Sequence, residues 1–105
     1  CVNGGAPMLR NTGIKPQVQD EICHLAEKYH LDRVILFGSR ARGDYWRASD
    51  IDLAVSGGDI TRFSLDLEEE TSTLLTYDVV NLDEKVSPEL LASIQKEGII
   101  LYEKV

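Results

Sequence analysis

The sequence predicts an α/β (α+β) domain in which helices pack on a small mixed β-sheet. Segments with helical spacing of apolar residues alternate with short apolar runs rich in Val and Ile, as expected when helices cover strands. The first two predicted strands are separated by only about a dozen residues, barely enough for a parallel crossover, which favours a mixed sheet over an all-parallel one. With 105 residues, the chain has the size of one domain.

Composition and charge exclude several classes of protein. Apolar residues make up 43% of the chain and charged residues 28%, as in ordinary folded proteins rather than disordered ones. The formal charge of −7 disfavours nucleic acid as a partner, because phosphate contacts need clustered Lys and Arg. No stretch approaches the roughly 18 apolar residues of a membrane helix, and no secretory signal is recognisable. We therefore expect a cytoplasmic protein without membrane contact.

The few cysteines and histidines form no pattern typical of a disulfide framework or a metal site. Cys1 and Cys23 are the only cysteines, and no CxxC motif is present, so Cys23 is interpreted as a packing or surface thiol. His24 and His30 are six positions apart, whereas a metal pair on one helix face needs a spacing of three or four. We therefore expect no metal ligation by these histidines.

The chain divides into a short N-terminal segment and one domain. Residues 1–14 are rich in Gly, Asn and Thr without periodicity, so we expect a flexible N-terminus. Met8 resembles a natural start, in which case part of residues 1–7 is not native. Residues 15–105 are expected to form the domain, and its first helix, residues 15–30, carries one apolar stripe. The stripe consists of Val18, Ile22, Leu25, Ala26 and Tyr29.

Two strands and a second long helix are predicted next. Residues 34–37 form a short β-branched apolar run that stops at Gly38, and residues 51–55 form another such run. Between residues 60 and 74 the apolar positions keep helical spacing. The acidic run at residues 68–70 is interpreted as a solvated face of this helix.

The C-terminal part predicts a strand, a helix and a final strand. Residues 77–81 are interpreted as a buried strand with one polar interruption. Ser87 is a favourable N-cap, and residues 88–97 form the predicted helix that follows it. Gly98 suits the position after the end of that helix, and residues 99–102 predict a last strand or edge segment.

The residue pattern with chemical meaning is Gly38-Ser39, ten residues, and then Asp50-Ile51-Asp52. Residues two apart in a strand project to the same face, so Asp50 and Asp52 are expected to point together while Ile51 packs behind them. Their repulsion and partial burial would raise a pKa unless a cation lies between them. Mg²⁺ is the natural candidate, and two such ions can stabilise both the attacking and the leaving oxygen. The pattern therefore indicates phosphoryl or nucleotidyl transfer.

The residues between the Gly-Ser pair and the acids are candidates for nucleotide binding. Gly38 permits close approach of a phosphate to the backbone, and Ser39 offers a hydroxyl and an N–H group. Three arginines, Arg40, Arg42 and Arg47, add positive charge, and at least one could bind the triphosphate. The alternative for each arginine is a solvated helix face.

Two aromatic residues lie in the same segment. Tyr45 and Trp46 could stack on a nucleobase, but packing or contact with a partner is the favoured interpretation.

This segment resembles the minimal nucleotidyltransferase (MNT) family of the DNA polymerase β nucleotidyltransferase superfamily. The family signature is Gly-Ser, ten residues and Asp-x-Asp, which residues 38–52 match without an insertion. The likeness extends over about residues 15–103 and implies a polymerase β-like core.

The resemblance implies roles for individual residues. Asp50 and Asp52 would bind Mg²⁺, expected as two ions, and a third carboxylate on a later strand would complete the site. Asp78, in the apolar run Tyr77-Asp78-Val79-Val80, matches that position and would also accept the proton of the attacking hydroxyl. Asp83 is the weaker candidate for the third carboxylate.

The resemblance also implies an activity and a partner. Such an enzyme would transfer a nucleoside monophosphate, by default AMP from ATP, to a hydroxyl acceptor and release pyrophosphate. Small MNT proteins commonly act as antitoxins beside a HEPN-domain ribonuclease and adenylylate a tyrosine on it. The alternative is a non-catalytic MNT-like antitoxin that neutralises its partner by occlusion. The sequence leaves homo-oligomerisation open.

Overall fold

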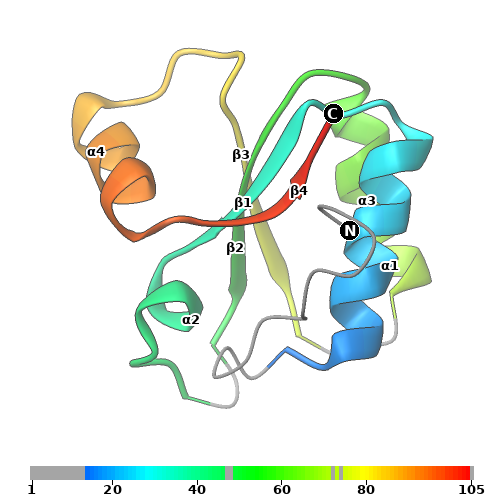
Figure 1. The fold of residues 1–105 in the computed structure, drawn as a ribbon, viewed down its shortest axis with the longest axis horizontal. Coiled ribbons are helices and arrows are strands. Elements are labelled where there is room, and N and C mark those ends of the chain that lie inside the picture. The colour runs from blue at the N-terminus through cyan, green and yellow to red at the C-terminus, as the bar shows by residue number, and fades with distance from the viewer. Residues whose placement is uncertain (1–13, 47–48, 72, 74, 105) are drawn as a thin grey trace.

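One mixed β-sheet organises the computed structural model, which describes residues 14–46, 49–71, 73 and 75–104. Its strands are β1 (Arg33–Phe37), β2 (Ile51–Ser56), β3 (Tyr77–Asn81) and β4 (Ile99–Glu103). The order across the sheet is β3-β2-β1-β4 (Figure 1). β1 pairs antiparallel with β2 and with β4, whereas β2 and β3 are parallel. The predicted α/β (α+β) class with a mixed sheet is confirmed.

Helices cover both faces of this sheet. α1 (Pro16–Lys28) and α3 (Ile60–Glu70) contact each other on one face, and α4 (Pro88–Glu97) lies on the other (Figure 1). The short α2 (Ser39–Arg42) follows the end of β1. Within the part of the chain that the structure describes, no helix combines the length and apolar character needed to cross a membrane.

Side-chain alternation along β2 divides the core into two clusters. Ile51, Leu53 and Val55 are fully buried in the larger cluster, to which α1 and α3 contribute. Ala54 belongs to the smaller cluster, which includes Ile94 of α4. Since residues two apart share a face, Asp52 lies on the α4 side of the sheet with Ala54. The apolar face therefore anchors β2, while the opposite face can carry a polar residue.

Two element predictions need correction. β3 has the predicted bounds but is not a buried strand: it forms an edge of the sheet, so its residues are partly buried and Asp78 is exposed. α3 ends at Glu70, where Thr71 takes an extended conformation, rather than at residue 74. Leu74 itself lies outside the described residues.

The C-terminal helix has the predicted bounds and cap. The Leu90 N–H donates to Ser87 Oγ at 3.3 Å, and Pro88 occupies the first turn. Gly98 follows the helix but has φ −65°, so it is not in the left-handed region. A Cβ there would lie 2.3 Å from the Ile94 carbonyl oxygen, so close packing rather than backbone twist favours glycine.

The structure tests the prediction for Cys23 but describes little of the N-terminal segment. Cys23 is a buried free thiol whose Sγ donates to the Leu101 carbonyl at 3.3 Å, which confirms a packing role. Of the predicted flexible segment 1–14, only Ile14 is described, and it is buried in the larger cluster. The predicted start of the domain at residue 15 stays a prediction.

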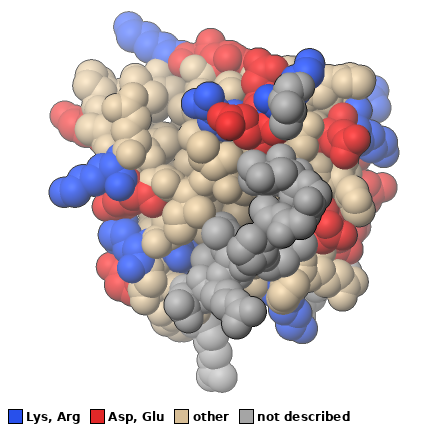
Figure 2. Space-filling view, viewed as in Figure 1, with Lys and Arg blue, Asp and Glu red and all other residues tan. Residues whose placement is uncertain are grey.

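Charged side chains of both signs are interspersed on the face that Figure 2 shows. On the face in Figure 2, Lys and Arg alternate with Asp and Glu near the edge, and uncharged residues occupy much of the left and centre. The described basic side chains on this face therefore do not gather into one patch.

Candidate active site

Asp52 and Asp78 lie side by side at one end of the sheet. They are partners in the parallel pairing of β2 and β3, and Asp52 is also the partner of Phe37 at the end of β1. Paired residues on neighbouring strands project to the same face, so both carboxylates lie on the α4 side. The third predicted acid, Asp50, precedes β2 by one residue and is exposed.

Asp50 is tied to the segment that leads into β3. Its Oδ1 accepts a hydrogen bond from Thr76 Oγ1, and the next residue, Ile51, donates its N–H to the Thr76 carbonyl at 2.9 Å. These bonds hold the starts of β2 and β3 together. The structure therefore brings the three predicted acids to the same end of the sheet.

The electrostatics of this end centre on Asp52. Burial raises the pKa of the Asp52 carboxyl, and the charges of Asp78 and Asp50 raise it further. The positive charges of Arg42 and Arg40 lower this pKa but do not cancel the increase. The pKa increase expected from paired acids is confirmed, and the ionised Asp52 carboxylate is a group that a bound cation would stabilise.

Gly38 packs directly against this carboxylate. Its backbone has φ +77°, in the left-handed region that favours glycine. A Cβ at this position would lie 2.2 Å from Asp52 Oδ2, so any other residue would push this carboxylate out of its place. Glycine is thus favoured twice, for the turn and for the contact with the acid. This contact explains why a glycine at this spacing accompanies Asp-x-Asp.

α2 begins immediately after that turn and is only one helical turn long. Ser39 is its first residue, and the Gly38 carbonyl accepts hydrogen bonds from the N–H groups of Ala41 and Arg42 at 3.1 and 3.0 Å. Gly43, with φ +90°, ends the helix. The predicted Gly-Ser turn and basic helical stretch are therefore present beside Asp52.

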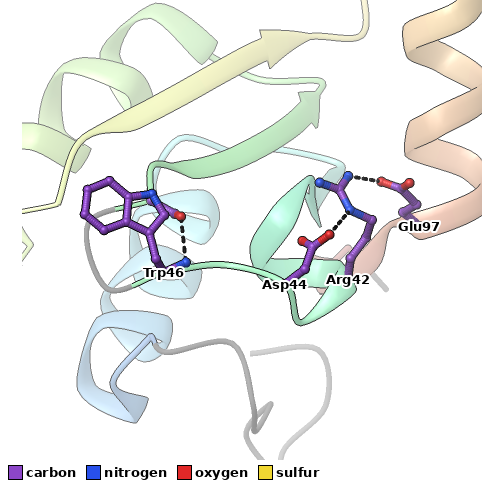
Figure 3. Close-up of polar contacts among 5 residues, drawn as sticks. Arg42, Asp44, Trp46 and Glu97 are labelled. Atoms are coloured by element: carbon purple, nitrogen blue, oxygen red, sulfur yellow. Dashed lines mark hydrogen bonds and ion pairs between the residues drawn. The ribbon is translucent and has the colours of Figure 1, made fainter.

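Of the candidate arginines, Arg40 is buried, so the alternative of a solvated helix face fails for it, whereas Arg42 is exposed and paired with carboxylates. The Arg40 side chain is only 1% exposed, and its Nε donates to the Ser49 carbonyl at 3.0 Å. Arg42 contacts two carboxylates: its Nε is 3.1 Å from Asp44 Oδ2 and its Nη1 is 2.9 Å from Glu97 Oε2 at the end of α4 (Figure 3). These contacts raise the Arg42 pKa, so it remains a cation. Arg47 lies outside the described residues.

Trp46 is not a packing residue. Its side chain is 69% exposed and points away from the Arg42 group (Figure 3). The backbone below it is fixed, since its N–H donates to Ser49 Oγ at 3.0 Å and its carbonyl accepts the Ser49 N–H at 2.9 Å. Of the three interpretations of this side chain given from the sequence, contact with a partner and stacking on a nucleobase remain.

Asp83 does not join the acids. Its Oδ2 accepts the N–H of Gly57 at 2.7 Å, and Gly57 follows the far end of β2. Gly57 lies five positions after Asp52 along an extended segment, which is roughly 16 Å. Of the two candidates for a third carboxylate, only Asp78 lies next to Asp52.

The donor set fits Mg²⁺, which prefers oxygen ligands and commonly uses one or two carboxylates together with substrate phosphates. Among residues 14–104, leaving out the undescribed positions, no three His, Cys, Asp or Glu side chains form a ready-made metal cluster. Asp50, which bonds to Thr76, would have to turn toward the ion or leave ligand positions to phosphate. A metal site in which carboxylates near Asp52 supply some ligands and nucleotide phosphates supply the others is compatible with both observations.

One open hollow, with a volume of about 760 Å³, lies elsewhere. It is lined by residues near the end of α1 and of β4, including His24, His30 and Tyr102. In the sheet, Arg33 pairs with Glu103 near this hollow, whereas Phe37 at the opposite end of β1 pairs with Asp52. The hollow is therefore not part of the acidic end.

Comparisons with known proteins agree with this geometry. The family described as "Polymerase beta, Nucleotidyltransferase" matches residues 20–105. A protein of Methanocaldococcus jannaschii named "Putative protein adenylyltransferase" is 32% identical over 96 residues, covering 81% of this chain and 94% of that protein.

Solved structures show the same fold. A chain of a structure described as a toxin-antitoxin with AMP-PNP superposes with a TM-score of 0.67 and 26% identity, over 82% of this chain and 73% of that one. A structure described as a "putative minimal nucleotidyltransferase" gives a TM-score of 0.61 and 29% identity, over 77% of this chain and 86% of that one. With a matching fold, motif and sequence family, the chain belongs to the polymerase β nucleotidyltransferase family and is a nucleotidyltransferase of its minimal, protein adenylyltransferase-like type.

Proposed function

We propose that this nucleotidyltransferase uses Mg²⁺ bound by Asp50, Asp52 and Asp78 to transfer AMP from ATP to a tyrosine hydroxyl of a HEPN-type toxin. The observation that carries the proposal is the crowding at Asp52, whose pKa is raised by burial and by the two neighbouring acids. Three carboxylates brought to one end of the sheet suit a divalent cation and a phosphate-bearing substrate.

Each residue of the site has a distinct task in this proposal. Bound Mg²⁺ would neutralise the triphosphate and stabilise charge on the leaving pyrophosphate. Asp78 is exposed beside Asp52, where an acceptor hydroxyl can reach it, and it would take the proton of that hydroxyl. Gly38 and Ser39 would bind phosphate oxygens, with the cationic Arg42 adding attraction. The new bond joins the hydroxyl oxygen to the α-phosphorus, and the bond from that phosphorus to pyrophosphate breaks.

The proposal for the partner is supported by the relatives. One matched structure is described as a toxin-antitoxin with AMP-PNP, and the archaeal relative carries a protein adenylyltransferase name. A protein acceptor is consistent with an exposed Trp46 close in sequence to Asp50. The chain would thus act as the antitoxin by modifying its partner.

A transfer assay with matched charge variants tests the proposal. Wild-type protein, Asp52→Asn and Asp83→Asn are incubated with the toxin partner, Mg²⁺ and α-labelled ATP, and labelled tyrosine is identified by mass spectrometry. Asp83→Asn removes the same charge at the far end of the sheet, and the Asn oxygen can still accept the Gly57 N–H. We expect label with wild type and Asp83→Asn, and none with Asp52→Asn or with EDTA.

The same assay separates catalysis from occlusion. If Asp52→Asn still labels the partner, the assignment of the acids is wrong. If wild type gives no label while both wild type and Asp52→Asn neutralise the toxin at equal molar ratio, the chain acts by occlusion and the catalytic proposal fails.

A further inference from the structure

We propose that Arg40 is a positioning residue that fixes the Ser49–Asp50 peptide unit, and so the Asp50 carboxylate, instead of binding the triphosphate. The identity of Asp50 as a metal ligand rests on the proposed function. The role of Arg40 in holding the segment before β2 rests on contacts within the chain.

Burial separates Arg40 from its neighbour Arg42. Among the residues that the structure describes, Arg40 is the one fully charged side chain that is buried, at 1% exposure. Arginine is rarely buried to this extent, because removing a guanidinium from water is costly unless its donors and its planar faces are well used. A side chain enclosed in this way is already committed to protein contacts and is poorly placed to follow a substrate.

The contacts of Arg40 join both sides of one loop. Its Nε donates to the Ser49 carbonyl at 3.0 Å, and its Cζ lies 4.9 Å from the centre of the Tyr45 ring. One guanidinium from α2 therefore holds both Tyr45 and Ser49. The cation over the ring and the hydrogen bond use different parts of the same rigid group.

The hydrogen bond to Ser49 acts on Asp50 because of peptide geometry. The Ser49 carbonyl oxygen and the nitrogen and Cα of Asp50 belong to one planar peptide unit. A hydrogen bond that holds this oxygen restricts the orientation of the peptide plane, and therefore the position of the Asp50 Cα. On its other side, Asp50 is held by Thr76 Oγ1, so the acid lies between an anchor on α2 and one next to β3.

Lysine at this position would keep the charge but lose the geometry. Its ammonium is a point charge at the end of a flexible stem, without an Nε–H partway along and without a planar face to stack on Tyr45. Arg40→Lys therefore distinguishes a loss of positioning from a loss of positive charge. Arg62→Lys, at a largely exposed site on α3, is the matched control.

The first measurement uses the only tryptophan of the chain, Trp46, which lies inside the loop that Arg40 holds. We expect Arg40→Lys to lower the steady-state fluorescence anisotropy of Trp46 while Arg62→Lys leaves it unchanged. Thermal unfolding in EDTA is recorded for each variant, and anisotropy is compared well below the unfolding range. An unchanged anisotropy in folded Arg40→Lys would overturn the proposal.

The second measurement uses Mn²⁺ alone as a probe of the acids, with free Mn²⁺ quantified by electron paramagnetic resonance. Groups that orient a ligand typically contribute 10- to 100-fold to metal affinity, so we expect weakening of about this size for Arg40→Lys. If Arg40 instead binds the triphosphate, Mn²⁺ affinity and anisotropy stay at wild-type values and only ATP affinity falls. That result would overturn the proposal.

A second variant keeps the test decisive if Arg40→Lys fails to fold. Tyr45→Leu removes the ring under the guanidinium but leaves Arg40, so it should shift anisotropy and Mn²⁺ affinity in the same direction by a smaller factor. In folded variants the two substitutions should be less than additive, because they disrupt one shared contact. No effect of Tyr45→Leu on either quantity would contradict the proposal.

These readouts do not depend on transfer activity. If wild type transfers no AMP but Arg40→Lys lowers both anisotropy and Mn²⁺ affinity, the function proposed above fails and the role of Arg40 stands. If transfer is observed and Arg40→Lys changes neither quantity, the proposed function stands and the role of Arg40 fails.

Discussion

The two ends of the sheet are built from the same parts and differ in their charge environment. At one end Gly38, with φ +77°, packs against the Asp52 carboxylate; at the other Gly57, with φ +76°, packs against the Asp32 carboxylate. In both places a glycine without a Cβ allows backbone and acid to approach closely. A left-handed glycine beside an aspartate is therefore not enough to define a catalytic site.

The two ends differ in the groups that surround the acids near each glycine. At the Gly57 end, Asp83 accepts a backbone N–H, and the Asp32 backbone is bonded to Ser56 and Lys104. At the Gly38 end, Asp52 is surrounded by Asp78 and Asp50, which raise its pKa. Two carboxylates thus lie near Gly57, and one of them accepts a backbone N–H, whereas three carboxylates meet at the Gly38 end and two of them raise the pKa of the third. The comparison shows that unfavourable charge, rather than backbone shape, distinguishes the proposed active site.

Alanine at each glycine should give the largest contrast between the two ends. Both substitutions introduce backbone strain and a close contact, so each should destabilise the fold by about 1 to 3 kcal/mol. Only Gly38→Ala displaces the Asp52 carboxylate, so it should lower AMP transfer by roughly 10³-fold, corresponding to about 4 kcal/mol of transition-state stabilisation. Initial rates at a temperature where both variants remain folded measure this. Equal losses of activity would remove the functional distinction between the ends.

A smaller effect is expected at the exposed aromatic residue of the acidic end. Trp46→Ala should reduce transfer to the partner by about tenfold, because a large exposed aromatic commonly anchors an interface. Mg²⁺-dependent ATP binding should be unchanged. Leu65→Ala, 57% exposed on α3, is the control and should affect neither. A loss of ATP affinity in Trp46→Ala would point to stacking on the base instead.

The smallest expected effect is on the stability of the metal-free protein. Since the folded pKa of Asp52 is raised above the ordinary value of 3.8, the folded state binds the proton more tightly than the unfolded state. Asp52 therefore makes stability fall as pH rises from about 3.8 through its higher folded pKa, and the loss is complete once the pH is above that folded pKa.

Neutral Asn removes this cost. In EDTA at pH 7, Asp52→Asn should unfold a few degrees higher than wild type, on the order of 2 to 5 °C for a domain of this size. Asp83→Asn should leave the unfolding temperature in EDTA at the wild-type value. Mg²⁺ with ATP should raise the unfolding temperature of wild type more than that of Asp52→Asn, through preferential binding to the folded state. A lower unfolding temperature for Asp52→Asn in EDTA would contradict the charge crowding.

Most elements could be predicted from local patterns. The bounds of β3 and α4 match their predicted ranges. β1 and β2 differ from theirs by one residue at one end, and α1 is shorter by one residue at its start and two at its end. Apolar periodicity and caps act over a few residues, so they are readable along the chain. The burial of β3 was mispredicted because an apolar run cannot reveal whether a strand has one neighbour or two.

The sequence by itself determined the family motif, the alternation of helices and strands, and the residue types able to bind metal and phosphate. Only the tertiary structure decided that β3 lies parallel beside β2, which brings Asp78 next to Asp52 and leaves Asp83 at the other end. It also decided that Arg40 is buried and bonded to Ser49, while Arg42 contacts Glu97 of α4. The physical reason is that periodicity and spacing are local, whereas strand order, register and burial depend on contacts between residues far apart in the chain.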